Sequence, residues 1–291
     1  MSSQLKKSES PGHALRRVCR WHVDQALAGL QKAHQPQGLH AVRKEIKKLR
    51  AIFRLTSGSL SGNDHRKTAK TMRLASKPLA ASRDARVTRM AFESLVRRKA
   101  RQFPNLRSAL QIHCRNAECS FKDQGSGTMA RYILKKIGGQ LHALKLKRAG
   151  WPEIRASLKK SYRRGRRAWE LARLESSADH FHEWRKAVKD LGYQLDFLRP
   201  AWSPKTKAML DGLKELGEQL GDAHDLVLLG DFVRKRCERS QETAALEPLI
   251  DARRSQLAAA IRQLGSRLYA KRPEYVCAQL ERDWKAWRRE H

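Results

Sequence analysis

Leu-His-Ala-Val-Arg-Lys-Glu-Ile-Lys-Lys-Leu-Arg-Ala-Ile-Phe-Arg, residues 39–54, is the stretch whose periodicity decides the fold. Its apolar side chains recur at helical spacing: Val42, Ile46, Leu49 and Phe53. A basic stripe lies beside them and consists of His40, Arg43, Lys47, Arg50 and Arg54, widened by Lys44 and Lys48. The stretch therefore predicts an amphipathic helix that buries one face and presents a row of cations on the next.

The same pattern returns in residues 181–198, at a constant offset of 142 positions. The basic residues at this offset are His182, Arg185, Lys186 and Lys189, and the apolar ones are Trp184, Val188, Leu191 and Leu195. A second pair of similar segments, 82–87 and 223–228, contains Asp84 and Asp225, which are 141 positions apart. Self-similarity in two places predicts an internal duplication, with each unit filling about half of the chain.

The chain is strongly basic. Its 291 residues include 62 Lys and Arg against 29 Asp and Glu, a net charge of +33. This excess is far beyond what solubility needs, and its self-repulsion destabilises a compact state unless anions neutralise it. Because 40% of the residues are hydrophobic, the chain can build a real core, which excludes a disordered basic tail.

No segment alternates with the strand period of two, so we predict an all-α protein whose helical-bundle halves bury their apolar stripes together. The predicted helices cover about 13–33, 39–54, 64–77, 82–102, a short segment after 104, 131–148, 153–174, 179–198, 205–220, 222–239, 243–269 and 274–289, with a break at 35–38. Gly150-Trp151-Pro152 marks the predicted boundary between the halves. The expected organisation is a flexible N-terminus (1–12), a first half (13–150) and a second half (151–291).

The cysteines and the N-terminus indicate a soluble intracellular protein. The five cysteines include no Cys-x-x-Cys pair, which favours reduced thiols. The first residues lack the apolar core of a signal peptide, and no apolar run reaches the length of a membrane span. His113, Cys114 and Cys119 resemble half of a metal site without a second half, so we expect no metal and no cofactor.

The repeated basic helices favour an anion site. In each, His-x-x-Arg-Lys-x-x-Lys places positive groups at i, i+3, i+4 and i+7 on one face, where they repel one another. A solvated surface explains one such helix, but two in register favour binding. Arginine gives phosphate bidentate contacts, and lysine gives point charges.

The paired motif, His-x-x-Arg-Lys-x-x-Lys-x-Leu followed by an Arg-Asp or His-Asp element, resembles the CHAD domain, the conserved-histidine α-helical domain, over about residues 11–291. The resemblance implies two four-helix-bundle halves, related by a pseudo-twofold, around a basic channel that binds inorganic polyphosphate without cleaving it. It implies that the first half lines the channel with His40, Arg43, Lys44, Lys47, Lys48 and Arg50, and the second with His182, Arg185, Lys186 and Lys189. Flanking helices add the predicted ligands Arg73, Lys77, Lys207 and Lys214.

The two halves are expected to contribute unequally. Gly192, Asp196 and Asp190 stand where the first half has Arg50, Arg54 and Lys48. The first half should therefore carry more of the phosphate charge. The chain leaves no room for the cyclase or triphosphatase tunnel domain that often accompanies this family, so we expect a stand-alone binding domain, cytoplasmic or associated with polyphosphate granules.

Several alternatives stay open at this point. His40 and His182 are either phosphate donors or structural residues near helix starts, and Asp84 and Asp225 are either helix N-caps or supports for an arginine of the basic helices.

His224-Asp225 permits a metal-dependent phosphohydrolase, although no second ligand cluster accompanies it. The charge also permits nucleic-acid binding, and residues 163–167 could serve as a nuclear address. Aromatic residues are only 7% and fall mostly in apolar stripes, so stacking platforms for bases are not apparent.

Overall fold

The computed structural model describes residues 3–32, 38–97, 100–144 and 149–290. Its helices are α1 (Pro11–Gln31), α2 (Gly38–Phe53), α3 (Gly62–Leu74), α4 (Ala80–Val96), α5 (Pro104–Asp123), α6 (Ser126–Ala143), α7 (Trp151–Leu174), α8 (Ala178–Phe197), α9 (Pro204–Arg236), α10 (Gln241–Tyr269) and α11 (Pro273–Arg289), with short 3-10 turns at Arg54–Thr56, Ala100–Gln102 and Arg199–Ala201. No residue in the described ranges lies in a strand, which confirms the all-α prediction. The predicted helix end at residue 33, the break at 35–37 and the predicted helical residues 145–148 lie outside the described residues.

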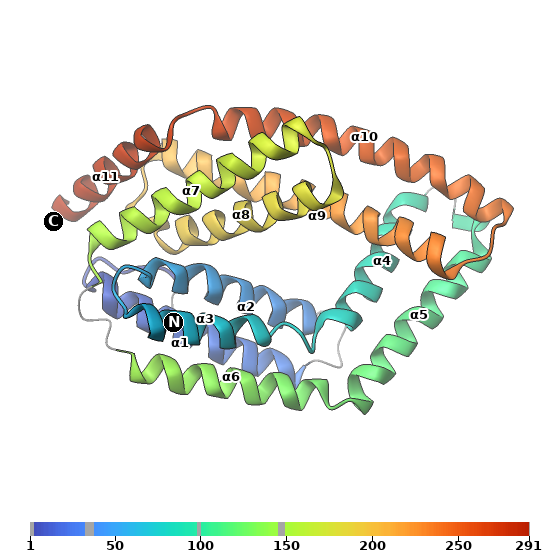
Figure 1. Ribbon diagram of the computed structural model, residues 1–291, viewed down its shortest axis with the longest axis horizontal. Helices are drawn as coiled ribbons and strands as arrows, with labels where there is room; N and C mark the ends of the chain where they lie inside the picture. Colours follow the sequence, from blue (N-terminus) through green and yellow to red (C-terminus); the bar gives the residue numbers. More distant parts are fainter. Residues whose placement is uncertain (1–2, 33–37, 98–99, 145–148, 291) are drawn as a thin grey trace.

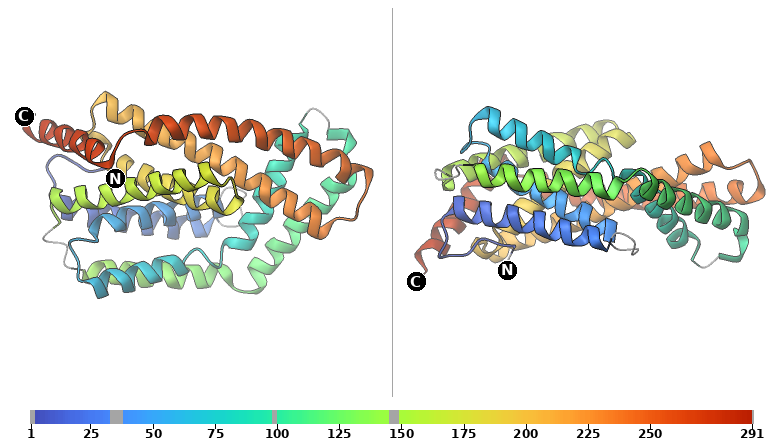
Figure 2. Two further views of the ribbon diagram at one scale, coloured as in Figure 1. Left: turned by 45° about the horizontal axis from the view of Figure 1, so that its top comes forward. Right: turned by 90° about the horizontal axis from the view of Figure 1, so that it is seen from below.

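The two basic helices meet in the middle of the molecule (Figure 1). Helix α2 packs on α1 and, across the middle, on α8, which in turn packs on α7 and α9. Helices α4 and α5 extend away from the other N-terminal helices and reach the far ends of α9 and α10 (Figure 2). Helix α4 contacts α9 directly, so α2, α4, α8 and α9 surround a common space.

The apolar stripes of α2 and α8 are buried, as predicted. Val42, Ile46 and Leu49 are 0% exposed, and Trp184 of α8 is 1% exposed. Burying each such side chain stabilises the fold by about 1.5–3 kcal/mol relative to exposing it. Between the two helices, Gln194 donates from Nε2 to the backbone oxygen of Ala51, 3.0 Å away. With the stripes facing the core, the neighbouring basic stripe of α2 faces the space between the helices.

Helix α9 is continuous over Pro204–Arg236, so the predicted break between residues 220 and 222 is wrong. In the first half, the chain divides into α3 and α4 around Pro78, and a proline in a helix interior removes a hydrogen bond and clashes with the preceding turn. The position 142 residues after Pro78 is Leu220, which continues a helix without cost. Figure 1 shows the bend between α3 and α4 and the single long α9.

Two other expectations about helix ends are corrected. Helix α4 begins at Ala80, so Asp84 lies inside it, and Asp225 lies inside α9. The N-cap interpretation is therefore wrong for both aspartates. Helix α5 runs for 20 residues from Pro104 and is not short. Its proline occupies the first turn, where the missing N–H carries no penalty.

The structure also bears on the predictions of reduced cysteines and of no membrane-spanning segment. All five cysteines are free thiols, and Cys19, Cys114 and Cys277 are buried. Burial raises the pKa of the Cys19 thiol to about 12, so this side chain packs as a neutral group. Over the described ranges, none of the helices combines the length and the apolar character that crossing a bilayer requires.

Candidate anion-binding site

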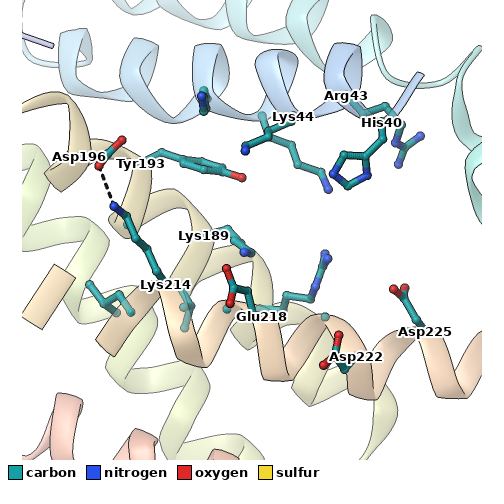
Figure 3. A pocket seen from close by; sticks show the side chains of 18 of the residues that line it. His40, Arg43, Lys44, Lys189, Tyr193, Asp196, Lys214, Glu218, Asp222 and Asp225 are labelled. Atoms are coloured by element: carbon teal, nitrogen blue, oxygen red, sulfur yellow. Dashed lines mark ion pairs between the residues drawn. The ribbon is translucent and has the colours of Figure 1, made fainter. Parts of the chain in front are cut away.

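A pocket of about 550 Å³ lies in the space that α2, α4, α8 and α9 surround, and we call it the central pocket. Its lining includes eight Lys and Arg side chains: Arg43, Lys44, Lys47, Lys48, Arg83, Arg185, Lys189 and Lys214. His40, Tyr193 and four carboxylates, Asp196, Glu218, Asp222 and Asp225, are the other charged or titratable side chains of its lining. Figure 3 shows basic side chains reaching from α2 toward α8 and α9.

Helix α2 forms the most basic wall of the central pocket. It supplies His40 and four cations, Arg43, Lys44, Lys47 and Lys48, because its basic stripe lies directly beside the buried apolar stripe. Arg43 donates from Nη1 to the backbone oxygen of Ser76, 3.3 Å away, which ties this wall to the segment between α3 and α4. Five of the six residues predicted from this helix therefore line one pocket.

Helix α8 supplies Arg185 and Lys189, and α9 makes room for both. A Cβ atom added at Gly217 would lie 3.0 Å from Cε of Lys189, and one added at Gly221 would lie 3.3 Å from Nη2 of Arg185. Such approaches are tighter than ordinary van der Waals contact. The glycines of α9 thus let the cations of α8 lie against the helix backbone, a use of glycine different from ending a helix.

Five of the eight cations have no carboxylate partner. Lys48 pairs with Glu45 at 3.2 Å, Lys214 with Asp196 at 3.0 Å, and Arg83 with both Asp84 at 2.9 Å and Asp225 at 3.1 Å. The others form no ion pair within 4.0 Å in the described part of the chain: Arg43, Lys44, Lys47, Arg185 and Lys189. The Nε atoms of Arg43 and Arg185 are also buried without a hydrogen-bond partner. The pocket therefore holds unneutralised positive charge together with free donors.

The pKa of Lys47 is lowered by its burial among these crowded cations. Burial, followed by the charges of Arg185 and Arg43, lowers the pKa of its ammonium to about 7. Burial likewise lowers the pKa values of Arg43, Arg185 and Lys189. An anion in the pocket would favour the charged forms and reverse these shifts.

Helix α9 brings the carboxylates. Burial raises the pKa values of Asp222 and Asp225, although cations stand nearby. Asp84 and Asp225 both accept from Arg83 of α4, and the contact with Asp225 joins α4 to α9. The arginine that these aspartates bond is therefore Arg83, which belongs to neither basic helix, and not the predicted arginine of a basic helix.

Arg83 is the site residue that sequence reasoning missed. It stands in the segment 82–87 on which the predicted repeat rests, but the sequence prediction covers only Asp84 there. A single arginine at the start of α4 carries no periodic signal. Its role depends on α4 crossing to α9, which is a tertiary fact.

Six predicted ligands lie outside the central pocket. Arg50 and Arg73 line a second pocket between α2 and α3. His182 lines a third, where its ring lies 4.7 Å from that of His224. Lys186 is exposed and pairs with Glu183, Lys77 is exposed beyond the end of α3, and Lys207 is half-buried on α9.

The two predicted histidines have different surroundings. Burial and nearby cations lower the pKa of His40 at the rim of the central pocket. His182 has an Nδ1 atom buried without a hydrogen-bond partner, and burial lowers the pKa of the adjacent His224 to about 4. His224 and Asp225 face different pockets. Across the ranges that the structure describes, no three His, Cys, Asp or Glu side chains form a group that could hold a metal ion.

The comparisons with known proteins agree with one another. The CHAD domain family model matches residues 14–234 of the chain. The crystal structure of the CHAD domain from the plant Ricinus communis has a similar fold, with a TM-score of 0.61 and 19% identity over 96% of this chain and 94% of that one. PptA from Streptomyces chartreusis gives a TM-score of 0.64 and 14% identity over 90% of this chain and 100% of that one. None of the curated proteins matches the sequence.

Proposed function

The chain belongs to the CHAD family, and from this premise we propose that its central pocket binds inorganic polyphosphate without cleaving it. One observation carries the proposal: five cations without carboxylate partners converge on one pocket. Such an arrangement is unfavourable when empty, because the charges are partly buried and repel one another. A ligand with many closely spaced negative charges converts the repulsion into attraction.

The donors suit phosphate oxygens. Arg43 and Arg185 face each other from α2 and α8, and each keeps a buried Nε without a partner. Guanidinium groups can hold phosphate oxygens bidentately, while Lys44, Lys47 and Lys189 add point charges along the pocket. A hydrogen bond to a charged group contributes about 1.5–3 kcal/mol. A few such contacts to one polyphosphate chain are enough for tight binding.

The lining favours polyphosphate over nucleic acid. Tyr193 is the one Phe, Tyr or Trp side chain in the lining, and burial raises the pKa of its hydroxyl to about 12. Proteins that bind single strands combine a basic groove with several aromatic side chains on which bases stack. A chain of phosphates has no bases to place and needs only the cations.

We propose binding without hydrolysis, and two of the four carboxylates in the lining support this part of the proposal. Asp225 accepts from Arg83, and Asp196 pairs with Lys214. These contacts position cations, and a carboxylate so held is a poor base for activating water. Glu218 and Asp222 form no ion pair within 4.0 Å in the described part of the chain, so an analysis of reaction products must test whether either acts as a base.

The test combines affinity with product analysis. Labelled polyphosphate should bind the protein and should resist displacement by single-stranded DNA or RNA at the same charge concentration and salt. Polyphosphate incubated with the protein and Mg²⁺ or Mn²⁺ should keep its full length on a gel. Steady release of orthophosphate by the pure protein would identify an enzyme, and equal displacement by DNA would favour a nucleic-acid-binding protein.

A further inference from the structure

A second basic pocket lies beside the C-terminal half of α2, where α3 packs against it. It has a volume of about 330 Å³ and is lined by four arginines, Arg50 and Arg54 of the α2 stripe and Arg66 and Arg73 of α3, together with His65. We call it the arginine pocket. It shares no lining residue with the central pocket, although Arg43, Lys47, Arg50 and Arg54 follow one another along the same stripe.

The arginines of this pocket outnumber the carboxylates around them. Asp190 of α8 pairs with Arg54 at 2.9 Å and also with Arg164 of α7. Arg50, Arg66 and Arg73 form no ion pair within 4.0 Å among the residues that the structure describes. One carboxylate thus serves two arginines, and three further arginines are not neutralised. Arg50 is half-buried, whereas Arg66 and Arg73 are exposed, so the excess charge lies at the open side of the pocket, where an anion can reach it.

His65 adds an unused polar atom. Its ring stacks on that of Phe53, with centroids 5.0 Å apart and planes 5° from parallel, which fixes its orientation in the lining. Its Nε2 atom is buried and has no hydrogen-bond partner. Buried polar atoms are usually hydrogen-bonded, so this Nε2 can donate to or accept from a group bound in the pocket.

The two arginines that continue the α2 stripe have no cationic counterpart in the second half. At the offset of 142 positions that relates α2 to α8, Arg50 and Arg54 correspond to Gly192 and Asp196. The cations Arg43 and Lys47 keep Arg185 and Lys189 at the same offset. General basicity would not remove the charge at two of these positions and retain it at the other two.

We propose that the arginine pocket is a second phosphate-binding site. The ligand chemistry is a phosphoryl group, since several guanidinium groups at one point suit its oxygens better than the two oxygens of a carboxylate. It comes either from the same polyphosphate chain, running along the α2 stripe from the central pocket, or from a separate short phosphate. The ligand class rests on the proposed function, but the existence of the site rests on the arginines and His65.

The test removes the positive charge of the two arginines that α3 contributes to the pocket. The double variant Arg66→Ala, Arg73→Glu removes two exposed arginines and leaves the Arg54–Asp190 pair intact. A matched control, Lys135→Ala, Lys136→Glu, makes the same charge change at exposed positions of α6 that line neither pocket. Isothermal titration with tripolyphosphate and with long-chain polyphosphate, after a check of helicity, compares both variants with the unmodified protein.

We expect the unmodified protein and the control to take up two tripolyphosphate ions, and the arginine-pocket variant one. If one long chain spans both pockets, the variant also loses about tenfold in affinity for long-chain polyphosphate, the value of one charged contact. If the phosphate is separate, only the second tripolyphosphate is lost. A variant that matches the control with both ligands overturns the inference.

The failure of this inference and that of the proposed function can be told apart. The variant Lys44→Ala, Lys47→Ala alters the central pocket alone. If it binds both ligands as the unmodified protein does, the proposed function of the central pocket is wrong, whatever the arginine-pocket variant shows. If it loses one site and the arginine-pocket variant loses none, the central pocket stands and the arginine pocket does not.

Discussion

Helices α2 and α8 carry the same motif, yet they use it differently. Helix α2 places four cations in the central pocket, and the stripe continues into the arginine pocket with Arg50 of α2 and Arg54 of the following 3-10 turn. Helix α8 contributes Arg185 and Lys189 to the central pocket, and beyond them it has Gly192 and Asp196. The comparison teaches that two helices with similar apolar stripes can both be buried in the core, while the positive charge is concentrated beside one of them.

The largest expected effect comes from removing equivalent triads. We compare two triple alanine variants, one of α2 (Arg43, Lys44 and Lys47) and one of α8 (Arg185, Lys186 and Lys189). The loss of affinity for polyphosphate should be about ten times larger in the α2 variant, because Lys186 lies outside the central pocket. Titrations at one salt concentration measure both losses. The apolar stripes are untouched, so circular dichroism should show unchanged helicity. Equal losses would contradict the unequal contribution of the two helices.

The next effect tests why the α8 cations reach the pocket at all. Gly221→Ala would bring a Cβ to 3.3 Å from Nη2 of Arg185, and should displace the guanidinium and weaken binding about three- to tenfold, an order-of-magnitude estimate for a partly lost charged contact. Alanine favours a helix by about 1 kcal/mol over glycine, so the melting temperature should not fall.

Gly139→Ala on α6 is the matched control, since nothing lies within 4 Å of its added Cβ. It should show the gain in stability without the loss of affinity. If Gly221→Ala binds as tightly as this control, the close approach of α9 has no role in placing Arg185.

A third test concerns pH, because Lys47 has a pKa of about 7 in the free protein. A polyanion favours its charged form, so binding takes up a proton and affinity should fall as pH rises through about 7, by up to about tenfold between pH 6 and 8. Titrations in buffers of different ionisation enthalpy measure the proton uptake. Lys47→Ala should lose this fall in affinity, which the Lys44→Ala control should retain. A fall that survives in Lys47→Ala would assign it to another group of the lining such as His40, because deprotonation of a terminal phosphate would strengthen binding instead.

Lys47 also makes the stability of the free protein depend on pH, and this stability should rise with pH where the affinity for polyphosphate falls. Its pKa is lower in the folded state than the ordinary value of 10.5, so the folded protein binds fewer protons than the unfolded chain over that interval. The penalty that the charge of Lys47 imposes on the folded state is therefore complete below about pH 7 and is relieved as the pH rises toward 10.5. Lys47→Ala should raise the stability of the free protein at pH 7 and weaken binding.

The smallest expected effect adds a cation to α8. Gly192 stands 142 positions after Arg50, it lines the central pocket, and nothing lies within 4 Å of an added Cβ. Gly192→Arg should tighten polyphosphate binding about three- to tenfold, reduced by screening at the open side of the pocket. Gly192→Gln is the control for helix propensity and size. A tighter complex with both variants would show that charge is not the cause.

Much of the fold followed from local patterns. The stripes of α2 and α8 are set by side-chain spacing alone, and their apolar residues are buried as predicted. The continuity of α9 is not predicted, because the pattern around Gly221 indicates a helix end, although the sequence shows Leu220 where the first half has Pro78. The glycine serves a contact between helices, which a local pattern does not report.

The site was less accessible to sequence reasoning than the fold. The row from Arg43 to Arg54 is one stripe, and only the packing of α3 and α8 against α2 divides it between two pockets. His182 matches His40 in sequence, yet it faces His224 outside the central pocket because its surroundings are built by α9 and α10. Arg83 reaches the pocket through the crossing of α4 and α9, a contact between distant segments.

The most direct test of the central claim is the acetylation rate of individual lysines, measured by mass spectrometry with and without polyphosphate. Lys44 and Lys186 occupy equivalent positions and are both exposed, but only Lys44 lines the central pocket. If polyphosphate occupies that pocket, it should slow acetylation of Lys44 and leave Lys186 and the α6 control Lys135 unchanged. Equal slowing at all three lysines, or none at Lys44, would contradict binding in the central pocket.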